Sequence, residues 1–285
     1  MKKIIQRILE FSLVGKIALI VIGFFIVLAI FSSQLSHYPY DLPSGAALQP
    51  PSREHWMGTD DLGIDIWAQL CYGARVSIMV GFTTAFLSVA GGGLVGVCAG
   101  YYGGKIDGWM MRLTDLMMII PQLPMMIVLG AFFGPSLKNI IFVLTLFSWT
   151  APARIVRSKV LSIKEEKYIL VAKSYGAGFF YMIQKHFLPQ TFSLMMVSFI
   201  QLISRAIVAE AGLSFLGLGD PTSKSWGLML NHGMAFRGIY FTDFWKWWIL
   251  FPLVCILTMV LAVSFVGKEI ERKEVSSYGK TTTKG

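Results

Sequence analysis

The chain has 285 residues, of which 55% are hydrophobic and only 14% are charged. Soluble globular domains carry about 25% charged residues, so this composition excludes an ordinary soluble fold, and the apolar and aromatic content excludes a disordered chain. Three cysteines that lie far apart in the sequence form neither a disulfide framework nor a zinc-binding spacing. The formal net charge of +9 is compatible with nucleic-acid binding until the positions of the basic residues are considered.

Six apolar runs with few or no charged residues are candidates for membrane spans, each of which needs roughly 20 helical residues. The runs lie at 17–36, 76–104, 116–137, 139–153, 187–219 and 247–267, the fifth interrupted by two ionisable residues. The fourth run is short, and it reaches the required length if Lys138 and Arg154 extend their charged ends to the two interfaces. The sequence therefore predicts an all-α polytopic membrane protein with six transmembrane helices.

The Lys and Arg residues are distributed unevenly between the two sides of these spans. Of the 25, 18 fall on the side that holds both termini, six fall on the other side, and Arg205 lies inside a span. Because cytoplasmic loops carry the excess of Lys and Arg, both termini are predicted to be cytoplasmic. The basic charge then reflects membrane topology, and we expect no nucleic-acid partner.

Residues 1–16 form the first of five expected regions, an amphipathic cytoplasmic helix that lies on the lipid of the inner leaflet. A signal peptide is disfavoured, because the apolar run that follows is too long and has no small-residue cleavage site. The other four regions are the first transmembrane helix at 17–36, an extracytoplasmic loop at 37–75, a transmembrane core at 76–267 that includes a cytoplasmic segment at 154–189, and a cytoplasmic tail at 268–285.

Three aspartates, Asp60, Asp61 and Asp65, lie close together in the outer loop. An EF-hand calcium loop needs a glycine at its sixth position and a glutamate at its twelfth, and neither is in register here. We therefore expect no metal site in this loop. Instead, Thr59 or Asp60 is expected to cap a helix whose polar face is solvated.

Glycines recur every four residues at Gly92, Gly96, Gly100 and Gly104 in the second predicted span. Such a stripe of small residues favours close packing of two membrane helices, and the lining of a pathway is the alternative. The stripe is not a nucleotide-binding loop, because Ile106 stands where a Walker A motif requires Ser or Thr. Energy from ATP is therefore expected to come from another chain.

Prolines and tryptophans give further local predictions. Pro121 and Pro124 lie in the third predicted span and are expected to kink it. Four tryptophans near the outer ends of the last spans are expected to be interfacial anchors: Trp226, Trp245, Trp247 and Trp248.

The cytoplasmic segment 154–189 is too polar to span the membrane and too apolar to be a linker. Its first part, 154–167, predicts a basic amphipathic helix. The apolar face of that helix is expected to hold Ile155, Val156, Val160 and Ile163.

A second helix is expected at 168–175, ending in a left-handed cap at Gly176. A third stretch, 179–187, is expected to stop at Leu188-Pro189, where the fifth span begins. A short apolar helix held outside the membrane by these breaks suits docking into the groove of a partner protein. The alternative is an interfacial helix lying on the leaflet.

Ionisable residues inside the fifth span are candidates for function, because a charge in the membrane is costly unless it faces a cavity or a partner. Arg205 and Glu210 are five residues apart, so they do not share a helix face and are not expected to pair. Gln201 lies one turn from Arg205 and is a candidate for the same cavity. Two interpretations of Arg205 remain open, pairing with another subunit and facing a translocation pathway.

The four histidines are dispersed, and no catalytic or metal-binding constellation is recognisable in the sequence. We therefore expect a protein that is not an enzyme and that holds neither a metal nor a cofactor.

Several motifs together point to a known family. They are EHWMGTDDLG at 54–63, YGAR at 72–75, GYYGG at 100–104, MRLTD at 111–115, ARIVR at 153–157, LSFLGLG at 213–219 and SWG at 225–227. The chain resembles, over about residues 50–235, the C-type permease subunits of dipeptide, oligopeptide and nickel ATP-binding-cassette (ABC) importers. These belong to the binding-protein-dependent transport inner membrane component family.

The family's cytoplasmic signature, the EAA motif, maps onto the second part of the segment 154–189. Leu170 stands in the place of the motif's glutamate and Val171 in that of its first alanine. The resemblance implies that coupling to an ATPase involves Leu170, Val171, Ala172, Gly176, Ala177, Leu188 and Pro189. Any polar contact that the glutamate makes in the family is lost here.

The resemblance implies a type I ABC importer permease fold in the bacterial cytoplasmic membrane, and import of di- or oligopeptides by alternating access. Import of nickel or a metal chelate is the alternative. The implied partners are a second homologous permease, two ATP-binding subunits and an extracytoplasmic solute-binding protein. A secondary transporter and a membrane enzyme are rival classes. The first lacks a clear inverted repeat and the second lacks a catalytic cluster.

Overall fold

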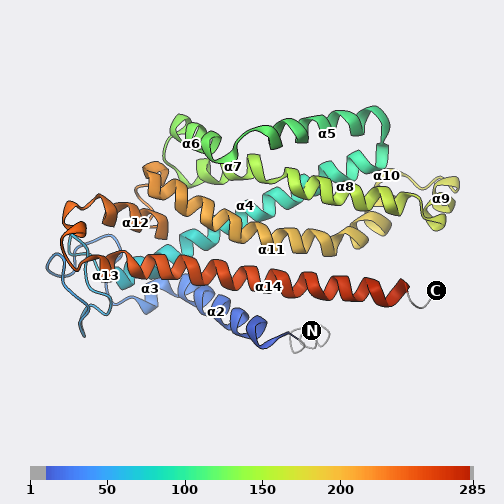
Figure 1. Ribbon diagram of the computed structural model, residues 1–285. Coiled ribbons are helices and arrows are strands. Elements are labelled where there is room, and N and C mark those ends of the chain that lie inside the picture. The colour runs from blue at the N-terminus through green and yellow to red at the C-terminus, as the bar shows by residue number, and fades with distance from the viewer. Residues whose placement is uncertain (1–10, 283–285) are drawn as a thin grey trace.

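The structure, a computed structural model, describes residues 11–282 as a bundle of long helices (Figure 1). Within these residues the only β-type pairing is an isolated bridge between Thr59 and Asp65. Both ends of the described chain and the short helix α9 (Lys167–Ser174) lie at one end of the bundle. The long loop before residue 66 lies at the opposite end. The expected all-α fold is confirmed.

The remaining helices are joined by short connections, except for the long loop between α3 and α4. In chain order they are α2 (Leu13–Ile30), α3 (Ser32–Leu35), α4 (Ile66–Tyr102), α5 (Gly104–Ile119), α6 (Gln122–Phe133), α7 (Leu137–Ser148), α8 (Thr150–Lys164), α10 (Phe179–Met182), α11 (Leu188–Leu213), α12 (Trp226–Ala235), α13 (Trp245–Trp248) and α14 (Leu250–Thr282). Two π-helical segments, η1 (Ile183–Phe187) and η2 (Ser214–Leu218), flank α11, and a 3₁₀ turn, η3 (Arg237–Tyr240), follows α12.

Five helical runs are long and apolar enough to cross a membrane. They are Leu13–Ile30, Ile66–Tyr102, Leu137–Lys164, Phe179–Leu218 and Trp245–Lys273. The pair α5 and α6 is the sixth candidate span, and it is bent by 88° at the break before Gln122. The kink predicted from the prolines is confirmed, because Pro121 lies at this break and Pro124 lies in the first turn of α6, where a missing N–H breaks no helical hydrogen bond.

α4 begins inside the region expected as the outer loop, where a capped helix was predicted. It begins at Ile66, so the cap expected at Thr59 or Asp60 is wrong. The cap is Asp65, whose Oδ2 accepts a hydrogen bond from the Ala68 N–H at 2.8 Å. With 37 residues, α4 is about 55 Å long and extends beyond the membrane at its outer end.

The expected solvated face at the aspartates is also wrong, because Asp60 and Asp65 are buried. Asp65 Oδ1 lies 2.8 Å from His55 Nδ1, and Asp60 Oδ2 accepts a hydrogen bond from Gln69 Nε2 at 2.7 Å. Within residues 11–282 no group of three or more potential metal-binding side chains occurs, here or elsewhere. The carboxylates therefore attach the outer loop to the start of α4.

The fourth span continues into the segment that was expected to be a separate cytoplasmic helix. By length and composition, α7 and α8 form one candidate span that ends at Lys164, ten residues beyond the predicted start of the cytoplasmic segment. Val156, Val160 and Ile163 are buried as expected. Ile155, which was placed on the same face, is 41% exposed.

The helix break expected at Leu188-Pro189 is absent from the described chain. α10, η1 and α11 form a continuous run, with Pro189 in the first turn of α11. Pro189 lacks the backbone N–H that would donate a helical hydrogen bond. The wider π-helical turn at Ile183–Phe187 lies directly before α11.

The two chain ends also differ from the expected boundaries. α14 continues to Thr282, past the expected start of the tail at residue 268. Residues 1–10 of the expected interfacial helix lie outside the described residues. At the first described residues, Ser12 caps α2, and its hydroxyl donates a hydrogen bond to Glu269 of α14.

Three of the four expected interfacial tryptophans are core residues. Trp226, Trp247 and Trp248 are buried, and only Trp245 is exposed. The Trp226 indole N–H donates to the Leu70 carbonyl at 3.1 Å. The outer ends of α4, α12 and α14 are therefore joined by aromatic packing within the protein.

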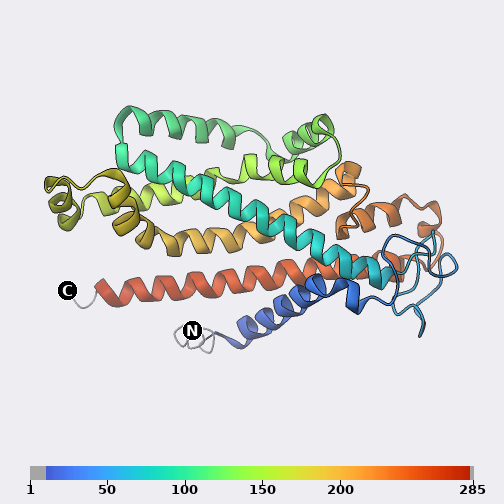
Figure 2. The same ribbon diagram turned by 180° about the vertical axis from the view of Figure 1, so that it is seen from behind.

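The glycine stripe packs α4 against α8, as the sequence predicts. α4 crosses the bundle from the outer-loop end to the end that holds α9 (Figure 2). A Cβ atom added at Gly92 would lie 2.3 Å from the Trp149 carbonyl oxygen, and one at Gly96 would lie 2.4 Å from the Ala153 carbonyl oxygen. Only glycine allows this approach. Gly104 lies beyond the contact, in the turn to α5.

We expect Gly92→Ala to destabilise the protein by about 1–3 kcal/mol, because the new methyl group collides with the α8 backbone. Gly91→Ala is the matched control, since a Cβ at Gly91 meets nothing within 4 Å. Thermal unfolding in detergent measures the difference. Equal midpoints for the two variants would contradict the close approach.

Candidate functional site

The short helix α9 is held against the ends of three long helices by one buried side chain. Ile169 is fully buried in a cluster that also contains Val97 of α4, Val160 of α8 and Phe187 of η1. Ala172 and Ala177 pack against the same cluster from the edge. Side chains of this size let α9 lie close to the bundle.

The end of α9 is a complete Schellman motif, which confirms the predicted left-handed cap. Gly176 has a φ of +83°, a conformation that strains other residues. The Ala177 N–H donates to the Ala172 carbonyl at 3.0 Å, and the Gly176 N–H donates to the Lys173 carbonyl at 2.9 Å. The motif ends the helix sharply and turns the chain toward α10.

The outward face of α9 carries exposed apolar side chains beside the polar Lys167 and Ser174. Leu170 and Val171 are 55% and 53% exposed, and Leu188 and Pro189 at the start of α11 are also exposed. Leu170, in the place of the family's glutamate, therefore presents an alkyl group where the motif has a charge. We call Leu170, Val171 and the exposed aromatic residues beside them the elbow surface; the aromatic residues are Tyr168, Tyr175, Phe180 and Tyr181.

These aromatic residues were not among the predicted site residues. They could have been identified, because aromatic side chains are concentrated in the segment 154–189, which is too polar to span the membrane. The structure also joins the two parts of the predicted site, since Gln190 Nε2 donates to the Tyr168 hydroxyl at 2.6 Å. That bond brings the start of α11 beside the start of α9.

Two lysines attach this region to the end of α4. Lys164 Nζ donates to the Tyr101 carbonyl at 2.8 Å, where the exposed carbonyls of a helix C-terminus favour a cation. Lys173 Nζ lies 5.3 Å from the centre of the Tyr101 ring. Burial, and to a smaller degree repulsion from Lys164, lower the pKa of Lys173.

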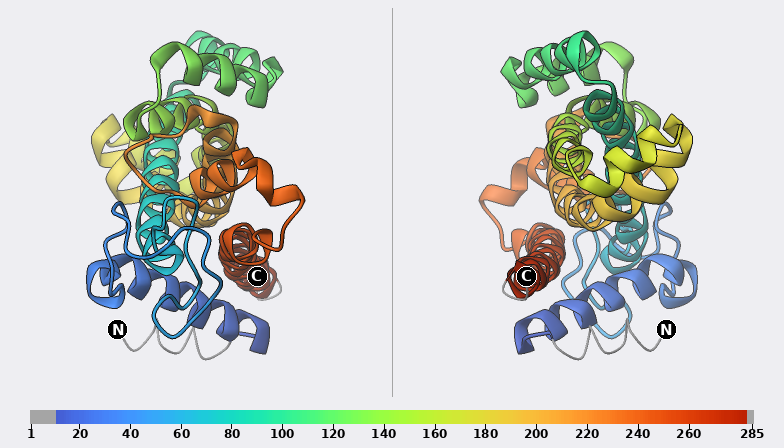
Figure 3. Two further views of the ribbon diagram at one scale, coloured as in Figure 1. Left: turned by 90° about the vertical axis from the view of Figure 1, so that its left-hand side faces the viewer. Right: turned by 90° about the vertical axis from the view of Figure 1, so that its right-hand side faces the viewer.

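The second group of predicted residues lies on α11, between α4 and α14 (Figure 3). Gln201 and Arg205 are both exposed and lie one turn apart on the same face. Gln201 Nε2 lies 3.5 Å from Glu271 Oε2 of α14. Arg205 has no ion pair or hydrogen bond with any residue of the described chain. Its guanidinium group is therefore available to a partner or a ligand outside this chain.

Glu210 points into the protein and is fully buried. Its Oε1 accepts a hydrogen bond from Ser214 Oγ at 2.7 Å, and its Oε2 accepts one from Ser77 Oγ at 3.3 Å. The carboxyl group thus joins α4, α11 and η2. In the described structure its side chain is enclosed, and its role as a pathway residue stays a prediction. The prediction that it does not pair with Arg205 is confirmed.

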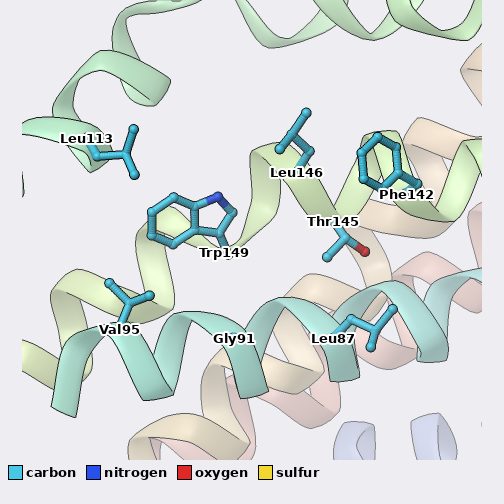
Figure 4. Close-up of a pocket in the computed structure, with 8 residues that line it drawn as sticks. All are labelled: Leu87, Gly91, Val95, Leu113, Phe142, Thr145, Leu146 and Trp149. Atoms are coloured by element: carbon cyan, nitrogen blue, oxygen red, sulfur yellow. The ribbon is translucent and has the colours of Figure 1, made fainter. Parts of the chain in front are cut away.

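A cavity of about 380 Å³ lies beneath α5, between α4 and α7 (Figure 4). Its walls are apolar apart from the Thr145 hydroxyl and the Trp149 indole N–H. Gly91 forms part of the α4 wall, and a Cβ atom there would meet nothing within 4 Å.

The bundle of apolar spans, with the exposed elbow surface between the fourth and the fifth, defines a multi-pass membrane protein. Residues 92–274 match the family described as "Binding-protein-dependent transport system inner membrane component", and the chain belongs to this family. It is therefore a permease component of a transport system and not an enzyme.

Curated relatives agree with this family over most of the chain. The dipeptide transport system permease protein DppC of Bacillus subtilis (strain 168) is 40% identical over 223 residues, which cover 78% of this chain and 68% of the relative. The oligopeptide transport system permease protein OppC of the same organism is 36% identical over 253 residues, which cover 88% of this chain and 81% of the relative. DppC of Alkalihalophilus pseudofirmus is 37% identical over 254 residues, covering 88% and 82%.

We expect Glu210→Leu to lower the free energy of unfolding by about 1–3 kcal/mol, because it leaves two buried hydroxyl groups without their acceptor. Glu210→Gln keeps an acceptor oxygen and is expected to lose less. Thermal unfolding and substrate uptake, each normalised to membrane abundance, measure both effects, with Val208→Ala as the exposed control on the same helix. A stable Glu210→Gln protein that no longer transports would contradict the structural role.

Proposed function

We propose that this chain is the permease subunit of an ABC importer that moves di- or oligopeptides across the bacterial cytoplasmic membrane. The observation that carries the proposal is the elbow surface, an apolar face that is exposed although α9 itself is fixed by Ile169. The relatives DppC and OppC are peptide permeases, which favours peptides over the alternative of nickel or a metal chelate. The matched family belongs to binding-protein-dependent transport systems, which favours ATP-driven import over a secondary transporter.

The proposed orientation places both termini and α9 in the cytoplasm. Both described chain ends and α9 lie at the same end of the bundle. Most of the Lys and Arg residues belong to loops and helix ends on this side. The outer loop with its buried aspartates then faces the binding protein.

The proposed complex contains a second homologous permease, two ATP-binding subunits and an extracytoplasmic solute-binding protein. An ATP-binding subunit grips the elbow surface, and its closure moves α9. Ile169 transmits this movement to α4 and α8, and η1 transmits it to α11. The spans then alternate between inward-facing and outward-facing arrangements.

The same proposal assigns Gln201 and Arg205 to the translocation pathway. An unpaired guanidinium group inside a span is costly unless water, a partner or a substrate meets it. A peptide carries a carboxylate that matches this charge. The Arg205 face is therefore the part of α11 that we expect to line the peptide's route.

We expect Val171→Asp to reduce ATPase co-purification and ATP-dependent peptide uptake by roughly tenfold or more, because a charge on the elbow surface must be desolvated on docking. Since Val171 is exposed, the fold should persist. Leu62→Asp is the matched control for ATPase co-purification, as Leu62 is a similarly exposed apolar residue at the opposite end of the bundle. Proteoliposomes containing the assembled complex measure uptake. Normal coupling in the Val171→Asp complex would contradict the proposed docking site.

We expect Arg205→Gln to reduce peptide uptake by roughly tenfold while the complex still assembles, and Arg205→Lys to retain most of the activity because it keeps the charge. Uptake and subunit stoichiometry should be measured on the same preparations. Loss of the second permease from the Arg205→Gln complex would instead indicate pairing between subunits. Unchanged uptake would place Arg205 outside the pathway.

A further inference from the structure

Two hydroxyl side chains extend the glycine stripe of α4 toward the end of the bundle that holds the outer loop. Ser88 and Thr84 lie one and two turns before Gly92, at the same spacing of four residues. Both side chains are fully buried. The stripe that packs backbone against backbone at its glycines therefore continues as a stripe that carries polar groups into the same contact.

The glycine contacts give the register between α4 and the run formed by α7 and α8. A step of four residues, from Gly92 to Gly96, moves the closest contact from the Trp149 carbonyl to the Ala153 carbonyl. The two runs therefore advance together, and one step toward the outer loop moves the contact to Thr145. α7 packs against α4 at this level, and Figure 4 shows the Thr145 side chain between the two helices.

Three hydroxyl groups meet at this point of the contact. The register places Thr145 at a level between Thr84 and Ser88. The hydroxyl oxygens of all three residues are shielded from solvent and have no hydrogen-bond partner among residues 11–282. We call these three residues the hydroxyl seam. A buried polar group without a partner is unfavourable, most of all between membrane spans, so the seam requires hydrogen bonds that the chain itself does not supply.

The seam differs from the ordinary pairing of threonine inside a helix. Thr191 Oγ1 donates to the Phe187 carbonyl at 2.9 Å, and Thr258 Oγ1 donates to the Val254 carbonyl at 2.6 Å. Serine and threonine in membrane helices commonly satisfy themselves in this way, on the carbonyl of the preceding turn. The hydroxyl groups of the seam form no such bond in the described chain, although they also lie inside helices.

The chemistry of the seam favours a small neutral ligand. Each hydroxyl group can both donate and accept a hydrogen bond, and a buried water molecule typically forms about three. A cation is disfavoured, because the three seam residues include no carboxylate to compensate a charge inside a span. The buried carboxyl group of Glu210 is already bound by Ser214 and Ser77. Ser77 precedes Thr84 by seven residues, about 10 Å along α4.

We propose that the hydroxyl seam is a binding site for ordered water, in which at least one molecule is hydrogen-bonded by Thr84, Ser88 and Thr145. The water satisfies the three hydroxyl groups and joins α4 to α7 just beyond the point where the direct backbone contact at Gly92 ends. The site depends neither on the proposed transport function nor on the orientation of the chain in the membrane.

The first test is X-ray radiolytic footprinting of the full-length protein in nanodiscs, because hydroxyl radicals formed from a bound water oxidise the side chains beside it. We expect oxidation of Ile141 and Leu144, which neighbour Thr145 on α7, and Leu144 is buried from bulk solvent. Thr145→Val keeps the shape of the side chain and should reduce this oxidation roughly threefold or more, because the water loses one of about three hydrogen bonds. Thr191→Val is the matched control, since that buried hydroxyl is paired within its own helix. Equal oxidation in the wild type and Thr145→Val, or none in either, would overturn the proposal.

The second test is thermal unfolding in detergent, which distinguishes a bound water from hydroxyl groups that are simply unpaired. Thr84→Val and Thr145→Val should each lower the midpoint by roughly 2–4 °C, because each removes a hydrogen bond to the water. The double variant should lose less than the sum of the two shifts, since both residues bind the same molecule. An unchanged or raised midpoint in the single variants would contradict the site, because replacing an unpaired buried hydroxyl by a methyl group is neutral or stabilising. A midpoint that changes when sodium replaces potassium would also contradict it, because it would identify a bound ion.

Discussion

The close backbone contact between α4 and α8 is the constraint on which the rest of the molecule depends. In a membrane the hydrophobic effect does not drive helices together, so their association relies on close packing and on hydrogen bonds. Gly92 and Gly96 remove the side chains that would separate the two helices. As a result, Lys164 reaches the C-terminal end of α4, and Val97 and Val160 belong to the same apolar cluster as Ile169. The position of the elbow surface follows from that contact.

Polar side chains determine which segments of this chain contact one another, which apolar packing alone does not. Glu210 connects three elements through two serine hydroxyls. Asp60 and Asp65 attach the outer loop to α4, where aspartates on a loop would otherwise be expected to face water. These hydrogen bonds explain why aspartates that were predicted to be solvated are buried. Arg205 differs from these carboxylates, because its charged group is exposed.

The sequence predicted the elements whose signal is local. Apolar runs located the spans, Pro121 located the bend of the third span, and Gly176 located the end of α9, because each depends on backbone chemistry within a few residues. Helix boundaries were less accurate. α4 begins nine residues before the expected end of the loop, and its cap is Asp65 in place of the predicted Thr59 or Asp60. The elbow surface was located correctly along the chain, but its aromatic residues and its link to Gln190 required the folded structure.

The sequence by itself determined that this chain is a helical membrane protein, because hydrocarbon leaves a polypeptide with no other way to satisfy its backbone across such runs. It also determined where α9 must end. Only the tertiary structure decided that Glu210 is interior and Arg205 is open, although both lie on one span. The physical reason is which residues lie nearby in the fold. Ser77, 133 residues away in sequence, donates a hydrogen bond to the Glu210 carboxyl, whereas no residue of the described chain forms a hydrogen bond or ion pair with the Arg205 guanidinium group.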